Sequence, residues 1–404
     1  MNDILERCAG MDVHKKSIST CIIIGSGEIA EKHIKTFQTT TPELQKLAVW
    51  LKSYDIKKLA IESTGVYWKP VFNVMENDFD LMLVNPRHMK NIPGKKTDVK
   101  DAEWICTLLK HGLLNKSFIP PKKIRELRDF TRLRKKYTQL KTSAKNRIIK
   151  FLECANIKLK SVASNIGGDS SWAVIKAIAN GQTDPYELAN LATKLRATKT
   201  EIVDALTGFI KQHDILMIQA AVREVEFYES EIAALDVKIS EAEKQFEEPV
   251  ELIRTFPGVG LISGATLLSE IGPDMAQFKS ANHLTSWAGL VPGNNESAGK
   301  IKSARISHGN VNLKAVLVQC SWSAVREKNG YWNSIYYRLK SRTGSKKAII
   351  AIARRILKMI YLALTLRLRY EDLNLNDNPE RIKKSMAYYA KKLEELTKKE
   401  VLAA

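Results

Sequence analysis

The order of apolar and polar positions in the first 115 residues predicts alternating strands and helices. Residues 17–24 are rich in β-branched side chains and precede the turn Gly25-Ser26-Gly27, so a β-hairpin is expected between Cys8 and Phe37. Thr41 followed by Pro42 is typical of a helix start. That helix is expected to end near Ser53, followed by a strand at 58–61, a helix at 66–77, a strand at 81–84 and a helix beginning near Asp98. This alternation indicates an α/β domain over residues 1–119.

After Pro120-Pro121 the apolar spacing becomes helical and stays so for most of the chain. Apolar residues three and four apart between Ile124 and Tyr137 predict a helix with one packed face. A helical insert is expected at 161–212, with turn signals at Gly167-Gly168 and Gly181. The expected fold is therefore α/β followed by all-α, with a central helical region at 120–250, a mainly helical domain at 251–370 and a charged helical tail at 371–404.

A second apolar stripe, between residues 225 and 246, alternates three and four apart like the core positions of a coiled coil. The stripe can pack within the chain, but an intermolecular or antiparallel coiled coil is at least as well supported. A homodimer or tetramer is therefore expected. The stripe consists of Val225, Tyr228, Ile232, Leu235, Ile239, Ala242 and Phe246.

Glycine and proline return in Phe256-Pro257-Gly258-Val259-Gly260, just before an apolar helix that starts at Leu261. This pattern has the form of a helix-hairpin-helix turn, in which backbone N–H groups approach a phosphate without reading sequence. Gly258 and Gly260 are thus candidate phosphate contacts, although a short motif of this kind is as often an ordinary tight turn.

The net charge of +20, from 64 Lys and Arg against 44 Asp and Glu, indicates that the protein has a negatively charged binding partner. It favours a polyanion, with nucleic acid the leading partner and an anionic membrane surface the alternative. Between residues 122 and 150 the only acids are Glu126 and Asp129. A solvated helix face is the ordinary interpretation, but so one-sided a charge run repels itself without a polyanion. The expected nucleic-acid contacts here are Lys122, Lys123, Arg125, Arg128, Arg132, Arg134, Lys135 and Lys136.

Several other classes of protein are disfavoured. No stretch approaches the ~20 apolar residues of a membrane-spanning helix, and the N-terminus lacks the pattern of a signal peptide, so a cytoplasmic protein is expected. The five cysteines are widely spaced without a C-x-x-C pair, which indicates neither a disulfide framework nor a zinc site.

Four acids in the N-terminal domain form the first candidate site. Asp12 and Glu62 each end an expected strand, and carboxylates at strand ends can converge at one edge of a sheet. Asp98 and Asp101 are three residues apart, so they share a face if that segment is helical. Any single acid in so basic a chain is more simply a salt-bridge partner. As a set, the four predict an oxygen cage for Mg²⁺ that leaves positions for phosphate oxygens.

A C-terminal loop forms the second candidate site, from Trp287 to Lys300 and on through Arg305 to Asn310. Small residues with nearby cations, Lys300 and Arg305, suit a serine that must approach a scissile phosphate. The residues alone do not choose among Ser297, Ser303 and Ser307, and by themselves they favour an ordinary surface loop.

Together these motifs resemble the DEDD transposases of the IS110 insertion-sequence family, in two blocks that occur in the family's order. The first block contains the Asp12 strand, Glu62-Ser63-Thr64-Gly65, Asn85-Pro86 and residues 96–102. The second runs from Pro257-Gly258-Val259-Gly260 through Ala288-Gly289-Leu290-Val291-Pro292 and Ser297 to Gly309-Asn310. Ala298 departs from the family, which often has glycine there, and residues 161–212 lengthen the middle of the chain.

The resemblance implies a RuvC-like domain of the RNase H fold, in which Asp12, Glu62, Asp98 and Asp101 bind Mg²⁺. It implies that Ser297 attacks a DNA phosphodiester to form a phosphoserine intermediate, followed by strand exchange and religation. It also implies guidance by a bridge RNA and an assembly in which metal and serine come from different subunits. Two other functions remain open: a RuvC-like junction endonuclease that uses metal-activated water, and a non-catalytic nucleic-acid-binding scaffold.

Overall fold

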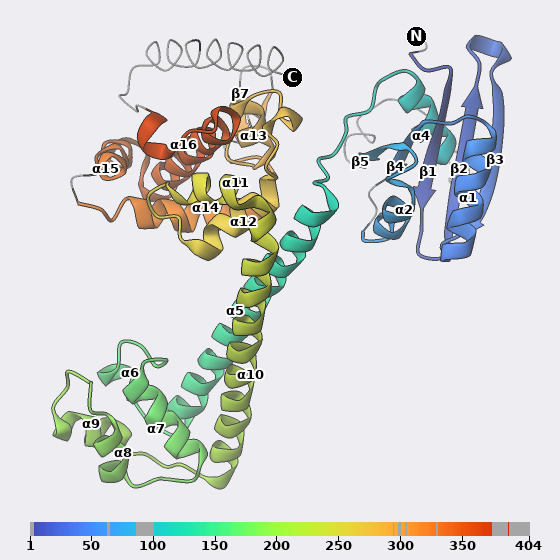
Figure 1. Cartoon of the computed structure of the whole chain (residues 1–404). Coiled ribbons are helices and arrows are strands. Elements are labelled where there is room, and N and C mark those ends of the chain that lie inside the picture. Colours follow the sequence, from blue (N-terminus) through green and yellow to red (C-terminus); the bar gives the residue numbers. More distant parts are fainter. Residues whose placement is uncertain are drawn as a thin grey trace. The chain divides into compact units, whose positions relative to one another are not determined.

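The strand-like segments near the N-terminus form one five-stranded sheet in a computed structural model of the chain (Figure 1). The structure describes residues 4–62, 65–85, 101–293, 295–297, 300–303, 305–328, 330–373 and 387. The strands are β1 (Arg7–Val13), β2 (Ser17–Ile24), β3 (Glu31–Gln38), β4 (Lys58–Glu62) and β5 (Asp80–Val84). Their order is β3-β2-β1-β4-β5. The expected hairpin is confirmed and continues into β3, because β1, β2 and β3 pair antiparallel, whereas β4 and β5 run parallel to β1.

Helices cover both faces of this sheet. On one face, Ala9 and Met11 of β1 belong to a core that includes Leu47 of α1 (Thr41–Ser53) and Val71 of α2 (Trp68–Met75). On the other face, Cys8 packs with residues of α4 (Asp101–Lys110). Because side chains alternate along a strand, the even-numbered residues of β1 face α4. The expected α/β domain is present, and Met1–Ile119 form one compact unit.

The second unit, Pro120–Ala404, contains two long helices that pair antiparallel. They are α5 (Lys122–Cys154) and α10 (Gln212–Glu243). Arg134 pairs with Asp236 and Arg147 pairs with Glu224, so the residue numbers rise along one helix as they fall along the other. Between them, α6 (Leu159–Val162), α7 (Asp169–Ala179), α8 (Pro185–Leu191) and α9 (Lys199–Leu206) form the helical insert at one end of the pair (Figure 1). The predicted coiled-coil stripe buries Val225, Ile232, Leu235 and Ile239 within the chain.

The remainder of this unit is a mainly helical domain. It consists of α11 (Glu247–Arg254), α12 (Leu261–Ile271), α13 (Ala281–Trp287), the strands β6 (Asn295–Ser297) and β7 (Lys300–Ser303), α14 (Val311–Ala324), α15 (Tyr331–Thr343) and α16 (Ser345–Leu366). Its core includes Phe256 and Trp332, each 2% exposed. Short 3₁₀ turns occupy Gly27–Ile29, Lys244–Phe246, Met275–Gln277 and Tyr370–Leu373. Among the described helices, none has both the length and the apolar character to cross a membrane.

Candidate functional site

Asp12 and Glu62 lie side by side at the carboxyl ends of two neighbouring parallel strands. The register pairs Met11 of β1 with Ile61 of β4, so the next residue in each strand is one of these acids. Gly10 and Ala60 pair in the same register, two residues earlier on each strand. Ala60 belongs to the core beneath α4, and side chains two apart share a face. Both acids therefore lie on the α4 face of the sheet.

Gly10 allows α4 to lie directly on β1. A Cβ atom at this position would be 2.3 Å from the backbone nitrogen of Cys106 and 2.5 Å from the carbonyl oxygen of Ala102. At the other end of the helix, the carbonyl oxygen of Lys110 accepts hydrogen bonds from the Ile4 and Leu5 amides. The helix thus runs antiparallel to β1, and its first residue, Asp101, lies at the end of the sheet that carries Asp12 and Glu62.

Asp12 is largely shielded from water and has a histidine neighbour. The residue is only 7% exposed, and one of its oxygens lies 3.0 Å from Nε2 of His14, which is itself largely exposed. The positive end of the α4 dipole points toward the same edge of the sheet. Among the described residues, no group of three or more His, Cys, Asp or Glu side chains is close enough to hold a metal ion. Asp98, the fourth acid of the predicted set, lies outside the described residues.

We expect Gly10→Ala to destabilise the N-terminal unit by about 1–3 kcal/mol, since the added methyl must displace the backbone of α4. Thermal unfolding of the full chain measures this loss. Gly27→Ala is the matched control for the loss of a glycine, because no atom lies within 4 Å of its Cβ position, although its φ of +67° adds local strain. Equal destabilisation by the two substitutions would contradict the close approach of α4 to β1.

Ser297 is the last residue of β6, in a two-stranded antiparallel sheet formed with β7. It pairs with Lys300, the first residue of β7, while Asn295 pairs with Ser303 farther from the turn. Pairing continues toward the helical domain, where the Gly293 amide donates to Arg305 and the Ser307 amide donates to Val291. Ser297 is thus carried at the turn end of an extended hairpin.

The two ends of this hairpin cross at a pair of glycines. A Cβ atom on Gly309 would be 2.3 Å from the backbone nitrogen of Gly289, and one on Gly289 would be 2.8 Å from the carbonyl oxygen of Ser307. Gly289 also has a φ of +71°, which side chains disfavour. Backbone packing of this kind excludes any larger residue and holds both ends of the hairpin at one place on the domain.

The structure separates the three candidate serines. Ser307 lies at the base, and its hydroxyl oxygen is buried without a hydrogen-bond partner. A buried hydroxyl has no access to a phosphodiester, so Ser307 is the weakest candidate of the three. Ser303 and Ser297 lie on the hairpin strands, with Ser297 nearer the turn.

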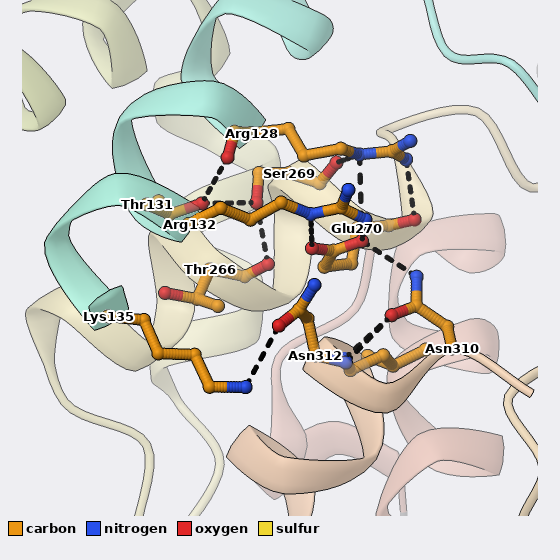
Figure 2. A network of polar contacts seen from close by, with 10 residues as sticks. Arg128, Thr131, Arg132, Lys135, Thr266, Ser269, Glu270, Asn310 and Asn312 are labelled. Atoms are coloured by element: carbon orange, nitrogen blue, oxygen red, sulfur yellow. Dashed lines mark hydrogen bonds and ion pairs between the residues drawn. The ribbon is translucent and has the colours of Figure 1, made fainter. Parts of the chain in front are cut away.

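A buried carboxylate, Glu270, anchors the chain just beyond this hairpin (Figure 2). It lies near the end of α12, is 0% exposed, and accepts two hydrogen bonds from Arg132 of α5, at 2.8 and 2.9 Å. One of its oxygens also accepts from the side-chain amide of Asn310 at 2.7 Å. The carbonyl oxygen of Asn310's own side chain accepts from the amides of Asn312 and Leu313, which caps α14. Glu270 therefore joins α5, α12 and the end of the hairpin segment.

The charges in this network stabilise one another. Burial alone would raise the pKa of Glu270, but the Arg132 hydrogen bond, the charges of Arg128 and Arg132 and the Asn310 hydrogen bond together lower that pKa below its ordinary value. Burial lowers the pKa of Arg128 to about 10, against the opposing effect of Glu270. Arg128 also donates to the carbonyl oxygens of Ser269 and Glu270. All three groups remain charged at neutral pH, and the network is structural in character.

The basic face of α5 differs from the sequence-based interpretation, because acids from distant elements neutralise much of it. Arg128 and Arg132 contact Glu270, Arg134 pairs with Asp236 of α10, and Lys135 donates to Asn312 of α14. Lys123 and Arg125 have local partners, Glu126 and the Pro120 carbonyl oxygen. The sequence showed only the acids within the helix itself, whereas the acids of α10 and α12 reach α5 through the tertiary fold. Nucleic-acid binding by these residues stays a prediction, best supported for the exposed Lys122 and Lys136.

Two helices, α11 and α12, flank the turn for which a helix-hairpin-helix pattern was predicted. Gly258 has a φ of +81°, and a Cβ there would be 2.4 Å from the carbonyl oxygen of Cys320 in α14. The amide of Gly260 donates to the side chain of Ser263, one turn into α12. Packing accounts for Gly258, and phosphate contact by these glycines, by Lys300 and by Arg305 stays a prediction.

Sequence reasoning did not single out Glu270. The available signal was a lone acid at the end of the apolar helix 261–271, but the residue's role depends on Arg132, 138 positions away. Asn310 belonged to a recognised motif, Gly309-Asn310, without an assigned role. The structure shows that both residues support the hairpin that carries Ser297.

Comparison with known proteins gives two matches to transposase families. A model of DEDD transposases of the IS110 type matches residues 9–157, which include Asp12, Glu62, Asp98 and Asp101. A second model, transposase of the IS116/IS110/IS902 family, matches residues 250–338, which include Ser297 and Glu270. Each proposed half of the site thus falls within one of the two matched regions.

Among curated proteins, the chain is similar to the insertion element IS900 uncharacterized 42 kDa protein of Mycobacterium paratuberculosis. The two are 33% identical over 181 residues, 42% of this chain and 45% of that protein. The putative transposase y4pF/y4sB of Sinorhizobium fredii is 27% identical over 140 residues, 33% of this chain and 36% of that protein. The chain spans less than half the length of each of these relatives.

Proposed function

This chain belongs to the IS110 family of insertion-sequence transposases, and from that premise we propose that it cuts and rejoins DNA through a covalent intermediate on Ser297. The observation that carries the proposal is the hairpin of β6 and β7. Ser297 ends β6 and pairs with Lys300 of β7, while the glycine crossing and the Glu270 network hold the other end of the hairpin. A covalent nucleophile must be able to reach the phosphate, and the segment that carries it must be held in a fixed position.

The proposed reaction is two successive transfers of one phosphoryl group. In the first, the Ser297 oxygen attacks the phosphorus of a DNA phosphodiester, the serine proton is lost, and one deoxyribose oxygen leaves. In the second, a hydroxyl end of another DNA strand attacks the same phosphorus, and the serine oxygen leaves and regains a proton. One phosphate ester replaces another at each step, so no external energy source is required.

The second half of the proposed site is the acidic edge of the sheet. Asp12, Glu62 and Asp101 share a face and an end of the α/β domain, and hard carboxylate oxygens fit the preference of Mg²⁺. Together with Asp98 they would hold Mg²⁺. The bound ion would offset negative charge on the phosphate oxygens. The RuvC-like assignment of this domain is part of the same proposal.

Partners enter the proposal through the family. DNA is the proposed substrate, and the charge of +20 supports binding to it. A bridge RNA and a homodimer or tetramer rest on the resemblance alone. The coiled-coil stripe gives the assembly no independent support, because much of it is buried against α5 within the chain.

Mapping a protein–DNA adduct tests the proposal directly. The full chain is expressed with a plasmid that carries the insertion element and its flanking sequence, and is denatured rapidly and digested with nuclease and protease. Mass spectrometry should find a nucleotide phosphate on the peptide that contains Ser297. A modified Ser303 would contradict the choice of nucleophile, and cut DNA without attached protein would instead support a water-using nuclease.

A further inference from the structure

The C-terminal helices contain a long segment without acids. No Asp or Glu occurs between Glu327 and Glu371, a stretch that includes all of α15 and α16. Four of its cations, Lys340, Arg342, Lys346 and Lys347, are exposed and form no ion pair with a described acid. This differs from α5, where Glu270, Asp236, Glu229 and Glu224 neutralise the basic residues. Among the described residues, α15 and α16 therefore carry a cluster of exposed cations without the interhelical ion pairs seen on α5.

These four cations gather where α15 meets α16. Gly344 alone separates the two helices, with a φ of +79° that turns the chain sharply. A hydrogen bond of 2.9 Å between the hydroxyls of Tyr336 and Ser345 ties the two helices together at this corner. Arg342 in the last turn of α15 is thus held close to Lys346 and Lys347 in the first turn of α16.

The placement of Lys346 and Lys347 is unfavourable for the helix itself. The first turn of a helix is the positive end of its dipole, where cations are destabilising and acids are preferred. No acid occurs in the first turn of α16. Helix stability therefore does not explain two adjacent lysines at this position, whereas an anionic ligand would.

An aromatic platform lies on α15 beside these cations. The side chain of Tyr337 is 57% exposed, and the Lys340 ammonium lies 5.4 Å from the centre of its ring. Tyr337 rests against Tyr336 at 5.3 Å between ring centres, and Tyr336 rests against Trp322 at 5.6 Å. The inner ring, Tyr336, is 5% exposed, so the exposed ring has a fixed base. An exposed aromatic ring among cations is the arrangement that binds unpaired nucleotides, through stacking on the base and attraction to the phosphates.

We propose that the corner of α15 and α16 binds unpaired DNA, with a base stacked on Tyr337 and backbone phosphates near Lys340, Arg342, Lys346 and Lys347. The stacking requirement favours a single strand, because the faces of bases in a duplex are already covered. The choice of DNA rests on the proposed function, since strand exchange exposes unpaired DNA. None of these residues belongs to the set proposed for the chemistry, so binding to this surface is measured without cleavage.

The test measures binding of the full chain to a fluorescent thymidine oligonucleotide at several salt concentrations. Tyr337→Ala should weaken binding about 5- to 150-fold, the range found for one stacked base, whereas Tyr337→Phe should bind like the wild type. The double substitution Lys346→Gln/Lys347→Gln should lower the slope of log affinity against log salt by about 1.4, because each lysine neutralises one phosphate of a single strand. Lys199→Gln/Lys211→Gln is the matched control, with exposed lysines at the starts of α9 and α10, and should change the slope less.

Unchanged binding by Tyr337→Ala would overturn the proposal. Equal or tighter binding to a duplex, or to a uridine oligoribonucleotide, with the same dependence on Tyr337 would overturn the assignment to unpaired DNA. If the wild-type protein binds the oligonucleotide but forms no adduct on Ser297, the proposed chemistry alone is contradicted. If it forms the adduct but does not bind the oligonucleotide, this surface alone is contradicted.

Discussion

Ser297→Ala is expected to eliminate the covalent protein–DNA adduct and the joined DNA product, while the protein stays folded and binds DNA. Removing the covalent nucleophile of an enzyme lowers its rate by a factor on the order of 10⁶, which places any residual strand exchange below detection. Ser297 ends a three-residue strand, and the substitution removes a single hydroxyl, so it should leave thermal unfolding nearly unchanged. The measurement is the yield of recombined plasmid together with the yield of adduct.

The matched control for this prediction is Ser303→Ala, which removes a hydroxyl from the facing strand of the same hairpin. It should retain the adduct and the recombined product. Cleavage of DNA at a normal rate by Ser297→Ala would contradict the serine mechanism and would favour metal-activated water as the nucleophile. Normal recombination by both variants would exclude the hairpin from the chemistry.

Glu270→Ala is expected to lower the free energy of unfolding of the C-terminal unit by about 3–5 kcal/mol. The substitution leaves the buried guanidinium of Arg128 and that of Arg132 without their shared carboxylate, and it removes the acceptor of Asn310. Asn310 caps α14 at the end of the hairpin segment, so DNA rejoining should fall together with stability. Urea denaturation of the full chain measures the change, with the N-terminal unit as an internal reference.

Asp236→Asn is the control for this second prediction, because it breaks another ion pair between a helix and α5. Its side chain is 36% exposed, so the expected loss is below about 1 kcal/mol. A similar loss for the two variants would show that burial of Glu270 is not what makes its ion pairs important.

The same carboxylate predicts a dependence of stability on pH. Its pKa in the folded chain is lower than the ordinary 4.5, so its stabilising contribution is complete above pH 4.5. The contribution is lost as the pH falls below 4.5 and through the folded value. Wild-type protein should therefore lose stability in this acid range more steeply than Glu270→Gln, which has no carboxyl group to protonate there. Parallel curves for the two proteins would contradict the lowered pKa.

Local patterns were sufficient to predict most of the secondary structure. The strand that ends at Glu62 and the helix that begins at Thr41 were placed correctly because alternation and capping signals are local. The position of α4 was less accessible, because it depends on the space above Gly10, which a linear pattern does not reveal. Similarly, the hairpin of β6 and β7 is three and four residues per strand, too short for alternation to identify.

The candidate site was predictable to the extent that its residues belong to local motifs. The acids at Asp12 and Glu62 were recognised as strand ends, yet only the parallel register of β1 and β4 makes them neighbours. Ser297, Ser303 and Ser307 were equivalent in the sequence. The buried hydroxyl of Ser307 argues against that residue, and burial is a property of the packed domain.

Residues close together in the chain were enough to predict most helices and strands, the excess of positive charge and the motifs that identify the family. The tertiary structure alone decided which charges remain available for a ligand. Arg132 meets Glu270 across 138 positions, whereas Lys346 and Lys347 meet no described acid. Electrostatic neutralisation depends on distance in space, and only folding brings an acid of one helix to the cation of another.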